Sequence, residues 1–221
     1  MINDLTQAEA KQRFGPLLSF WVNPRHINFG IKKNFDVCND PMPHLDFFKY
    51  FVMGGDWDKD GVPVGEDRNF LDIQDLIKFG KEYSKTMSFS RYVYEIIQKI
   101  PQKNHLGNRF ESRDNVEDSF EFYLNLIEKM RQEGYIKKDY LNDGKKDSDI
   151  GVAIGRLGEL IHFRKGHHRL AIAKQIGLER VAIAVQLVHP DWIVKEMRAI
   201  KCEESLAIEN GLRSLATRYE I

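Results

Sequence analysis

The order of apolar patterns between residues 150 and 189 constrains the fold of this chain more than any other feature. "IGVAIGRLGELIHF" predicts two short strands around a turn at residues 156–158, and "GHHRLAIAKQIG" predicts a helix that Gly177 ends. "VAIAVQLVH" has period 2 and indicates a central strand, with one face formed by Val181, Ile183, Val185 and Leu187. Two strands, a helix and a further strand predict an α+β fold built on a small mixed sheet.

The preceding part of the chain has short elements and loops, followed by helices. "LTQAEAKQRFG" predicts an opening helix with Thr6 as its N-cap and Gly15 at its end, and "PLLSFWVNPRHINFGI" predicts an extended segment. Helical spacing follows in "NFLDIQDLIKFGKEY", "SFSRYVYEIIQKI" and "NVEDSFEFYLNLIEKMRQEGY". We therefore expect a mainly helical region, residues 1–145, packed on a core at residues 146–221 that ends in helix, with "DYLNDGKKDSD" as the boundary loop.

The charges of the 221-residue chain balance, with 33 lysine and arginine residues against 33 aspartate and glutamate residues. This balance argues against a nucleic-acid or anionic-membrane partner, so any anion site must be local. Cys38 and Cys202 match no metal or redox spacing. The first residues lack the apolar core of a signal peptide, and no apolar run approaches the roughly 18 residues that span a bilayer. These features predict a cytoplasmic protein with no membrane partner.

The stretch "RKGHHRLAIAKQIG" gathers cationic and hydrogen-bonding side chains at the predicted start of a helix. A helix N-terminus presents unpaired N–H groups and partial positive charge, which favours an anion such as phosphate. Gly166 would let the anion approach the backbone, and His167, His168 and Arg169 would donate hydrogen bonds. The surrounding segment is basic, with Arg156, Arg164, Lys165, Arg169, Lys174 and Arg180. The same residues would equally suit a solvated surface, and the spacing does not choose between the two interpretations.

Residues 150–189, which include "GELIHFRKGHHRLAIAKQIGLERVAIAVQLV", resemble the core motif of the ParB/sulfiredoxin superfamily: a strand, a G-x-H-R-like turn, an alanine-rich helix, a glycine and a strand. Members include partition-protein CTPases, ATP-using sulfiredoxins, free-serine kinases and nuclease-like domains. The resemblance implies that Gly166, His168 and Arg169 contact the phosphates of ATP or CTP, with Lys165 and His167 beside them. Sulfiredoxins carry their reactive cysteine at the position of His167, so sulfinic-acid reduction is not expected. Relatives often carry an aspartate where this chain has Lys165, so a catalytic carboxylate must come from elsewhere.

The loop "GGDWDKDGVPVGED" offers such carboxylates. Asp56 and Asp58 flank Trp57, and they could hold Mg²⁺ beside a polyphosphate or take a proton from an acceptor hydroxyl. The alternative is a pair of solvated turn aspartates with Trp57 packed on the core. The spacing also resembles the opening of an EF-hand, but Asp67 stands where that loop has a bidentate glutamate, and Pro63 and the paired glycines fit it poorly.

These features favour a phosphotransferase that uses Mg²⁺ and ATP or CTP and acts on a small hydroxyl-bearing molecule. Catalytic roles would fall to Asp56, Asp58 and His167, with Mg²⁺ held by the two aspartates and phosphates held by residues 165–169. One alternative is a nucleotide-binding switch that hydrolyses slowly and signals through a partner or a homodimer. The other is a nuclease or DNA-binding module, against which the balanced charge and the lack of a helix-turn-helix pattern argue.

Overall fold

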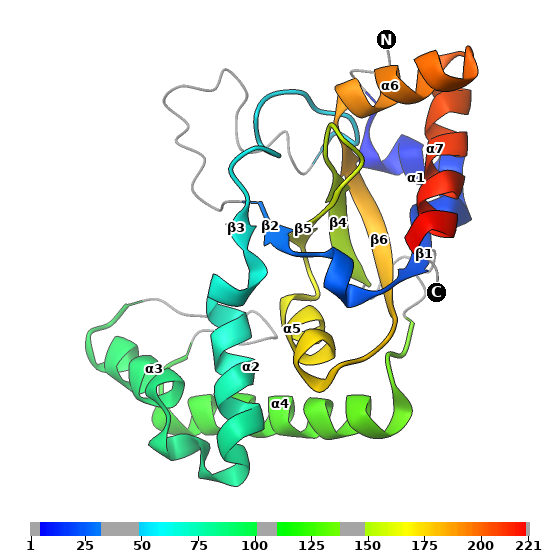
Figure 1. The fold of residues 1–221 in the computed structure, drawn as a ribbon. Helices are drawn as coiled ribbons and strands as arrows, with labels where there is room; N and C mark the ends of the chain where they lie inside the picture. Colours follow the sequence, from blue (N-terminus) through cyan, green and yellow to red (C-terminus); the bar gives the residue numbers. More distant parts are fainter. Residues whose placement is uncertain (1–4, 32–48, 101–109, 138–148, 220–221) are drawn as a thin grey trace.

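The computed structural model of the chain describes residues 5–31, 49–100, 110–137 and 149–219 (Figure 1). These residues form an α+β fold with a six-stranded mixed sheet in the order β1-β6-β4-β5-β2-β3. The predicted fold class is therefore confirmed at the level of a mixed α+β protein. The predicted boundary between residues 145 and 146 lies outside the described residues.

The strands come from both sides of that predicted boundary. β6 (Val181–Val188) lies between β4 (Ile150–Ile154), to which it is parallel, and β1 (Ser19–Val22), to which it is antiparallel. β5 (Leu160–Arg164) pairs antiparallel with β4. The far edge is short: β2 (Phe29–Gly30) runs parallel to β5 and pairs antiparallel with β3 (Val62–Pro63). The N-terminal region thus completes the sheet of the predicted core.

The helices begin and end close to the predicted positions because their caps are local. Thr6 and Glu9 form a capping box on α1, and Gly15 ends this helix. In the described ranges the α-helices are α1 (Gln7–Phe14), α2 (Arg68–Phe79), α3 (Met87–Ile97), α4 (Arg113–Glu133), α5 (His167–Ile176), α6 (Pro190–Ile200) and α7 (Glu204–Tyr219). Short 3-10 segments occur at η1 (Gly15–Leu18), η2 (Pro24–His26), η4 (Val64–Glu66) and η5 (Gly80–Lys85).

β6 is buried along its whole length, as expected of a central strand. Its side chains, however, do not alternate regularly between the two faces of the sheet. Successive residues of β4 pair with Val185 and Leu187, so Gln186 is an extra residue in β6. Such a bulge shifts the alternation of the side chains that follow. Ile183 and Val185 therefore face the larger core, whereas Leu187 packs in a smaller cluster with Trp57. The prediction of one face shared with Leu187 is wrong for this reason.

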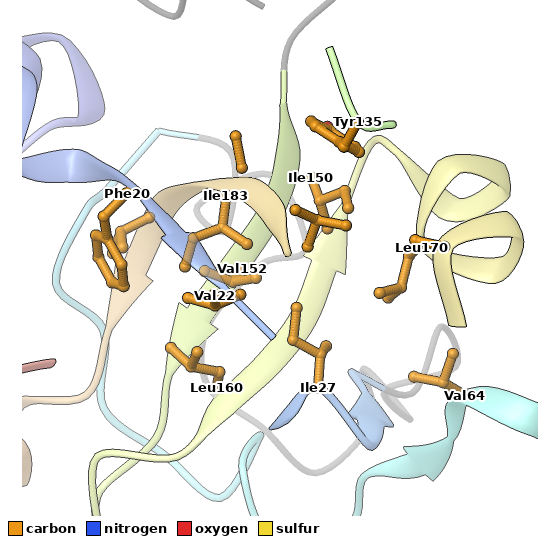
Figure 2. Close-up of a cluster of buried hydrophobic side chains, with 14 of the residues drawn as sticks. Phe20, Val22, Ile27, Val64, Tyr135, Ile150, Val152, Leu160, Leu170 and Ile183 are labelled. Atoms are coloured by element: carbon orange, nitrogen blue, oxygen red, sulfur yellow. The ribbon is translucent and has the colours of Figure 1, made fainter. Parts of the chain in front are cut away.

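The larger core lies between the sheet and the helices. Side chains from β1, β4, β5 and β6 gather there with Leu170 of α5 and Tyr135, which follows α4 (Figure 2). α5 packs against α2 and α4, which lie below it in Figure 1, and α7 packs against α6 and β1. The helical region therefore covers α5, the helix that begins at the predicted anion site.

Candidate functional site

A left-handed turn joins β5 to α5. Lys165 and Gly166 have positive φ angles of 59° and 70°. Residue 166 must be glycine because a Cβ there would lie 2.9 Å from the Cα of Ile150 on β4. The buried imidazole of His162 places Nε2 3.0 Å from the carbonyl oxygen of Lys165. Since a carbonyl only accepts, Nε2 carries the proton, and His162 holds the turn in place.

α5 begins without a side-chain cap. Its N-cap is Gly166, and the first helical hydrogen bond runs from the N–H of Leu170 to the carbonyl of Gly166 at 2.8 Å. The N–H groups of a first turn have no acceptor within their helix, and they carry the positive end of its dipole. The predicted helix start at "GHHR" is therefore confirmed, and its geometry suits an anion.

Two of the predicted phosphate ligands contact groups within the protein. His168 stacks on Tyr123 of α4, with ring centroids 4.0 Å apart. Arg169 donates through Nη1 to the hydroxyl oxygen of Tyr135 at 3.3 Å, and this hydroxyl donates to buried Asp149 at 3.3 Å. Burial raises the pKa of Tyr135, so its hydroxyl keeps the proton that it donates. His168 and Arg169 thus brace α5 against the helical region, and a phosphate would compete with these contacts.

His167, the first residue of α5, lines a cavity of ≈ 290 Å³ between α5, the β2–β3 edge and α2. The ring of His167 meets that of His162 edge-on, with centroids 4.3 Å apart. The apolar wall consists of Ile31, Val62, Pro63, Val64, Phe70, Phe163 and Leu170. The polar side chains are Glu66, Asp67, Arg68, His162 and His167. The cavity thus joins the start of α5 to the start of α2.

The α2 side of this cavity is held by polar contacts. Asp67 caps α2 by accepting a hydrogen bond from the backbone N–H of Asn69 at 2.8 Å. Arg68 donates two hydrogen bonds to Glu95 of α3, at 3.0 and 2.6 Å, and lies 4.1 Å from the ring centroid of Tyr92. These contacts fix Arg68 at the cavity wall.

The sequence prediction did not include Glu66, Arg68 or His162 in a site, and it considered Asp67 only as part of an EF-hand. "GEDRN" does carry the signal of a helix N-cap. This segment lies near α5 because β5 pairs with β2 and β2 pairs with β3, and no local sequence pattern reveals these pairings. Glu66 is exposed, and within the described ranges it makes no hydrogen bond or ion pair through its side chain.

The GGDWD loop lies at the other end of the β4–β5 hairpin, against Arg156 in its turn. The Asp58 carboxylate, 1% exposed, accepts hydrogen bonds from the backbone N–H and Nε of Arg156 at 2.8 Å and from Nη2 at 2.7 Å. Exposed Asp56 accepts from the same guanidinium at 3.0 Å. Trp57 is buried and donates from Nε1 to the carbonyl of Met53 at 3.0 Å. Trp57 therefore packs on the core, whereas Asp58 is neutralised by an ion pair and not solvated.

The structure does not bring Asp56 or Asp58 to the start of α5. β5 begins at Leu160 beside the turn that holds Arg156, and it ends at Arg164 beside α5. A strand rises about 3.3 Å per residue, so these ends lie roughly 13 Å apart. A Mg²⁺ ligand must approach to about 2 Å. The structure therefore separates Asp56 and Asp58 from "GHHR", beside which their catalytic and metal-binding roles were predicted.

The electrostatics of the GGDWD loop also disfavour a cation there. Burial alone would raise the pKa of Asp58, but hydrogen bonds from Arg156 outweigh it and hold this pKa below its ordinary value. Hydrogen bonds from Lys59 and Arg156 lower the pKa of Asp56. The guanidinium thus takes the place that a metal would need, and Asp67, as a helix cap, completes no EF-hand. Among the described residues, no group of three or more His, Cys, Asp or Glu side chains could hold a metal ion.

The basic residues of this segment do not form an open cationic surface, because most of them contact specific protein groups. Arg164 donates to Gln186 and Gln7, and half-buried Lys174 donates to the carbonyls of Pro24 and Ile27 at 3.0 and 2.7 Å. The guanidinium carbon of Arg180 lies 4.9 Å from the ring centroid of Trp21, and the partners of Arg156 and Arg169 are given above. The local excess of positive charge is therefore mostly structural.

Comparison with known proteins gives no information on the function, so the function is inferred from the geometry of the site. No protein-family model, curated protein or solved structure matches the chain. The resemblance to the ParB/sulfiredoxin superfamily accordingly stays a prediction. Within the described ranges, no helix has the length and apolar character needed to cross a membrane. The cytoplasmic location stays a prediction as well.

Proposed function

We propose that the chain binds ATP or CTP at the start of α5 and transfers the terminal phosphoryl group to a small hydroxyl-bearing molecule in the adjoining cavity. The observation that carries this proposal is that the first turn of α5, which has no side-chain cap, borders a cavity of ≈ 290 Å³ through His167 and Leu170. Phosphate oxygens would accept hydrogen bonds from the N–H groups of residues 167–169. The ParB/sulfiredoxin resemblance, which assigns ATP or CTP phosphates to this turn, supports the same assignment.

The size of the cavity indicates which of the two substrates it would hold. Pockets for drug-sized ligands hold about 300–1,000 Å³. A cavity of ≈ 290 Å³ accommodates a small acceptor and not a whole nucleoside triphosphate as well. The acceptor would occupy the cavity, and the triphosphate would lie across its mouth, along the first turn of α5.

The residues of the cavity can be given roles in this transfer. The acceptor oxygen forms a bond to the γ-phosphorus, the bridging β–γ bond breaks, and the nucleoside diphosphate leaves. Glu66 replaces Asp56 and Asp58 as the proposed base that takes the hydroxyl proton, and His167 would donate a hydrogen bond to phosphate. Mg²⁺ would neutralise phosphate charge when bound, and Glu66 and Asp67 are the carboxylates of the cavity that could hold it.

Calorimetric titration of the full chain with ATP and with CTP, in the presence of Mg²⁺, tests the binding step. We expect one nucleotide per chain, with weaker binding in His167→Ala. Asp58→Asn is the matched control, because Asp58 lies at the far end of the β4–β5 hairpin, and its affinity should equal that of wild type. If the His167→Ala variant binds as tightly as wild type, the site is elsewhere.

Product analysis separates this function from its alternatives. Transfer of γ-labelled phosphate to a hydroxyl-bearing small molecule, abolished in Glu66→Gln, supports the phosphotransferase. Release of inorganic phosphate with no labelled acceptor would identify the nucleotide-dependent switch. The DNA-binding alternative gains no support from the basic segment, since most of its cations already contact protein groups. A gel shift that persists at physiological salt would restore it.

A further inference from the structure

A second cavity, of ≈ 480 Å³, lies between the turn of the β4–β5 hairpin, β2 and the end of α7. Its volume falls within the range of about 300–1,000 Å³ that is usual for small-molecule sites. In the ladder between β2 and β5, the pair Phe29 and Ile161 lines this second cavity, whereas the next pair, Gly30 and His162, lines the cavity of ≈ 290 Å³, hereafter the first cavity. Within the described part of the chain, the two cavities share no lining residue. The second cavity is therefore separate from the site proposed for nucleotide and acceptor.

Large apolar and aromatic side chains form part of the wall of the second cavity. Phe29 on β2 and Leu157 in the hairpin turn are 50% and 70% exposed, and both line the cavity beside the start of β5. The rings of His26 and Tyr219 meet at its edge, with centroids 5.0 Å apart. Exposed apolar side chains that meet in a concave site favour a ligand with an apolar body, which would shield them from water.

Some of the charges of the second cavity are already compensated. Among the described residues, the charged side chains that line it are Asp58, Lys59, Glu159 and Arg218. The carboxylate of Asp58 binds Arg156, and Nζ of Lys59 lies 2.8 Å from Oδ1 of Asp56. These two charges have partners without a ligand. The charges left for a ligand are therefore one guanidinium and one carboxylate.

Arg218 and Glu159 supply this guanidinium and carboxylate. Within the described ranges, Arg218 makes no hydrogen bond or ion pair through its side chain, and the Glu159 carboxylate accepts one hydrogen bond, from the backbone N–H of Leu157 at 2.9 Å. Their neighbours in the chain are in contact, because the hydroxyl of Tyr219 donates to the carbonyl of Gly158 at 3.3 Å. A cation and an anion thus border the same cavity without pairing with each other.

We propose that the second cavity binds a zwitterion with an apolar body, of the class of α-amino acids with an apolar side chain. The carboxylate of the ligand would accept hydrogen bonds from the Arg218 guanidinium, and its ammonium would donate to Glu159. The apolar body would lie on Phe29 and Leu157. A ligand with a charge of one sign would cover either Arg218 or Glu159 without pairing it, which is unfavourable. Binding here needs no nucleotide, so this proposal and the phosphotransferase can fail independently.

Titration of the isotope-labelled full chain with phenylalanine and with leucine, followed by amide NMR, tests the proposal. Phenylpropionate and phenylethylamine, and for leucine isocaproate and isoamylamine, each lack one of the two charges. We expect each amino acid to bind at least about tenfold more tightly than its analogues and to shift the signals of Leu157 and Gly158. Failure of both amino acids to bind overturns the proposal. So does an analogue that binds as tightly, or shifts confined to Gly30 and His162 in the first cavity.

Variants that remove one charge test the two contacts. Arg218→Met and Glu159→Gln should each weaken phenylalanine binding by about tenfold or more, and glutamine keeps an oxygen that can accept the backbone hydrogen bond. The matched controls are Arg213→Met and Glu209→Gln on α7, which remove an exposed cation and a half-buried carboxylate. These two residues pair with each other at 2.9 Å and do not line the second cavity. Circular dichroism establishes that each variant is folded, and wild-type affinity in either Arg218→Met or Glu159→Gln overturns the proposal.

Discussion

Replacing Gly166 with alanine tests whether the turn before α5 needs a residue without a side chain. At φ 70°, an alanine is disfavoured by about 1–2 kcal/mol through steric conflict with its own backbone. Its Cβ would also lie 2.9 Å from both the Cα and the Cγ1 of Ile150. Ile150 is fully buried in β4, so relief requires movement of the strand, and overpacking of this kind costs about 1–3 kcal/mol. The expected loss in the free energy of unfolding is therefore about 2–5 kcal/mol.

Gly177→Ala provides the control for this substitution. Gly177 ends the same helix at φ 75°, but a Cβ there would meet nothing within 4 Å. Only the backbone contribution of about 1–2 kcal/mol applies. Urea unfolding of both variants gives the difference, and since about 1 kcal/mol shifts the Tm of a domain this size by roughly 2–4 °C, thermal unfolding should rank them alike. Equal destabilisation of the two variants would refute the argument, because the approach of Gly166 to Ile150 would then contribute nothing.

Further predictions concern the two ends of the β4–β5 hairpin. His162→Phe removes the donor to the Lys165 carbonyl and should lower the free energy of unfolding by about 1–3 kcal/mol in urea, because a buried acceptor loses its partner. A Phe variant as stable as wild type would exclude that role. Arg156→Ala leaves the Asp58 carboxylate buried without its cation, so it should lower the free energy of unfolding in urea by about 2–4 kcal/mol. If Arg156→Ala lowers this free energy by less than Asp58→Asn does, the result would contradict the ion pair. Because the folded-state pKa of Asp58 lies below the unfolded value of about 4, the stability it contributes is present above that pH and is lost as the pH falls through the folded pKa. The advantage of wild type over Asp58→Asn in denaturant midpoint should accordingly shrink below about pH 4.

The parts of the fold that follow from short-range chemistry were predictable from the sequence. Thr6 caps α1 and Gly134 ends α4, and both are recognised from residues within one helical turn. The first turn of α5 was located in the same way, from Gly166 and the apolar spacing after it. The position of the helix start that favours an anion could thus be predicted from the sequence.

The cavity beside that helix was not predictable, because it depends on which segments meet. Glu66 and Arg68 reach α5 only through the pairing of β3 with β2 and of β2 with β5. The ion pair of Asp58 was not predicted, for a related reason. Its partner Arg156 lies in a turn that is distant in sequence, and an aspartate beside glycines has the same local pattern whether it binds a metal or a guanidinium.

The bulge at Gln186 illustrates a third kind of failure. An apolar alternation predicts one face for a strand only if every residue pairs in step with the neighbouring strand. β5 also carries an extra residue, Phe163, in its pairing with β4. Both irregularities lie beside Arg164, whose guanidinium donates to Gln186. The polar side chain of Gln186 thus has a partner inside the sheet, and the sequence pattern gave no sign of either bulge.

The pairing of β1 with β6 has a consequence for biosynthesis. Val22 leaves the ribosome long before its partner Val181, which emerges only after the residues between them have been made. β4 likewise can pair with its parallel neighbour β6 only after β6 has been synthesised. Contacts between such distant residues slow folding, and until they form, the apolar strands are exposed to other chains. The nascent protein should therefore depend on chaperones until residue 188 is free, and truncation before β6 should leave even the N-terminal segments aggregation-prone.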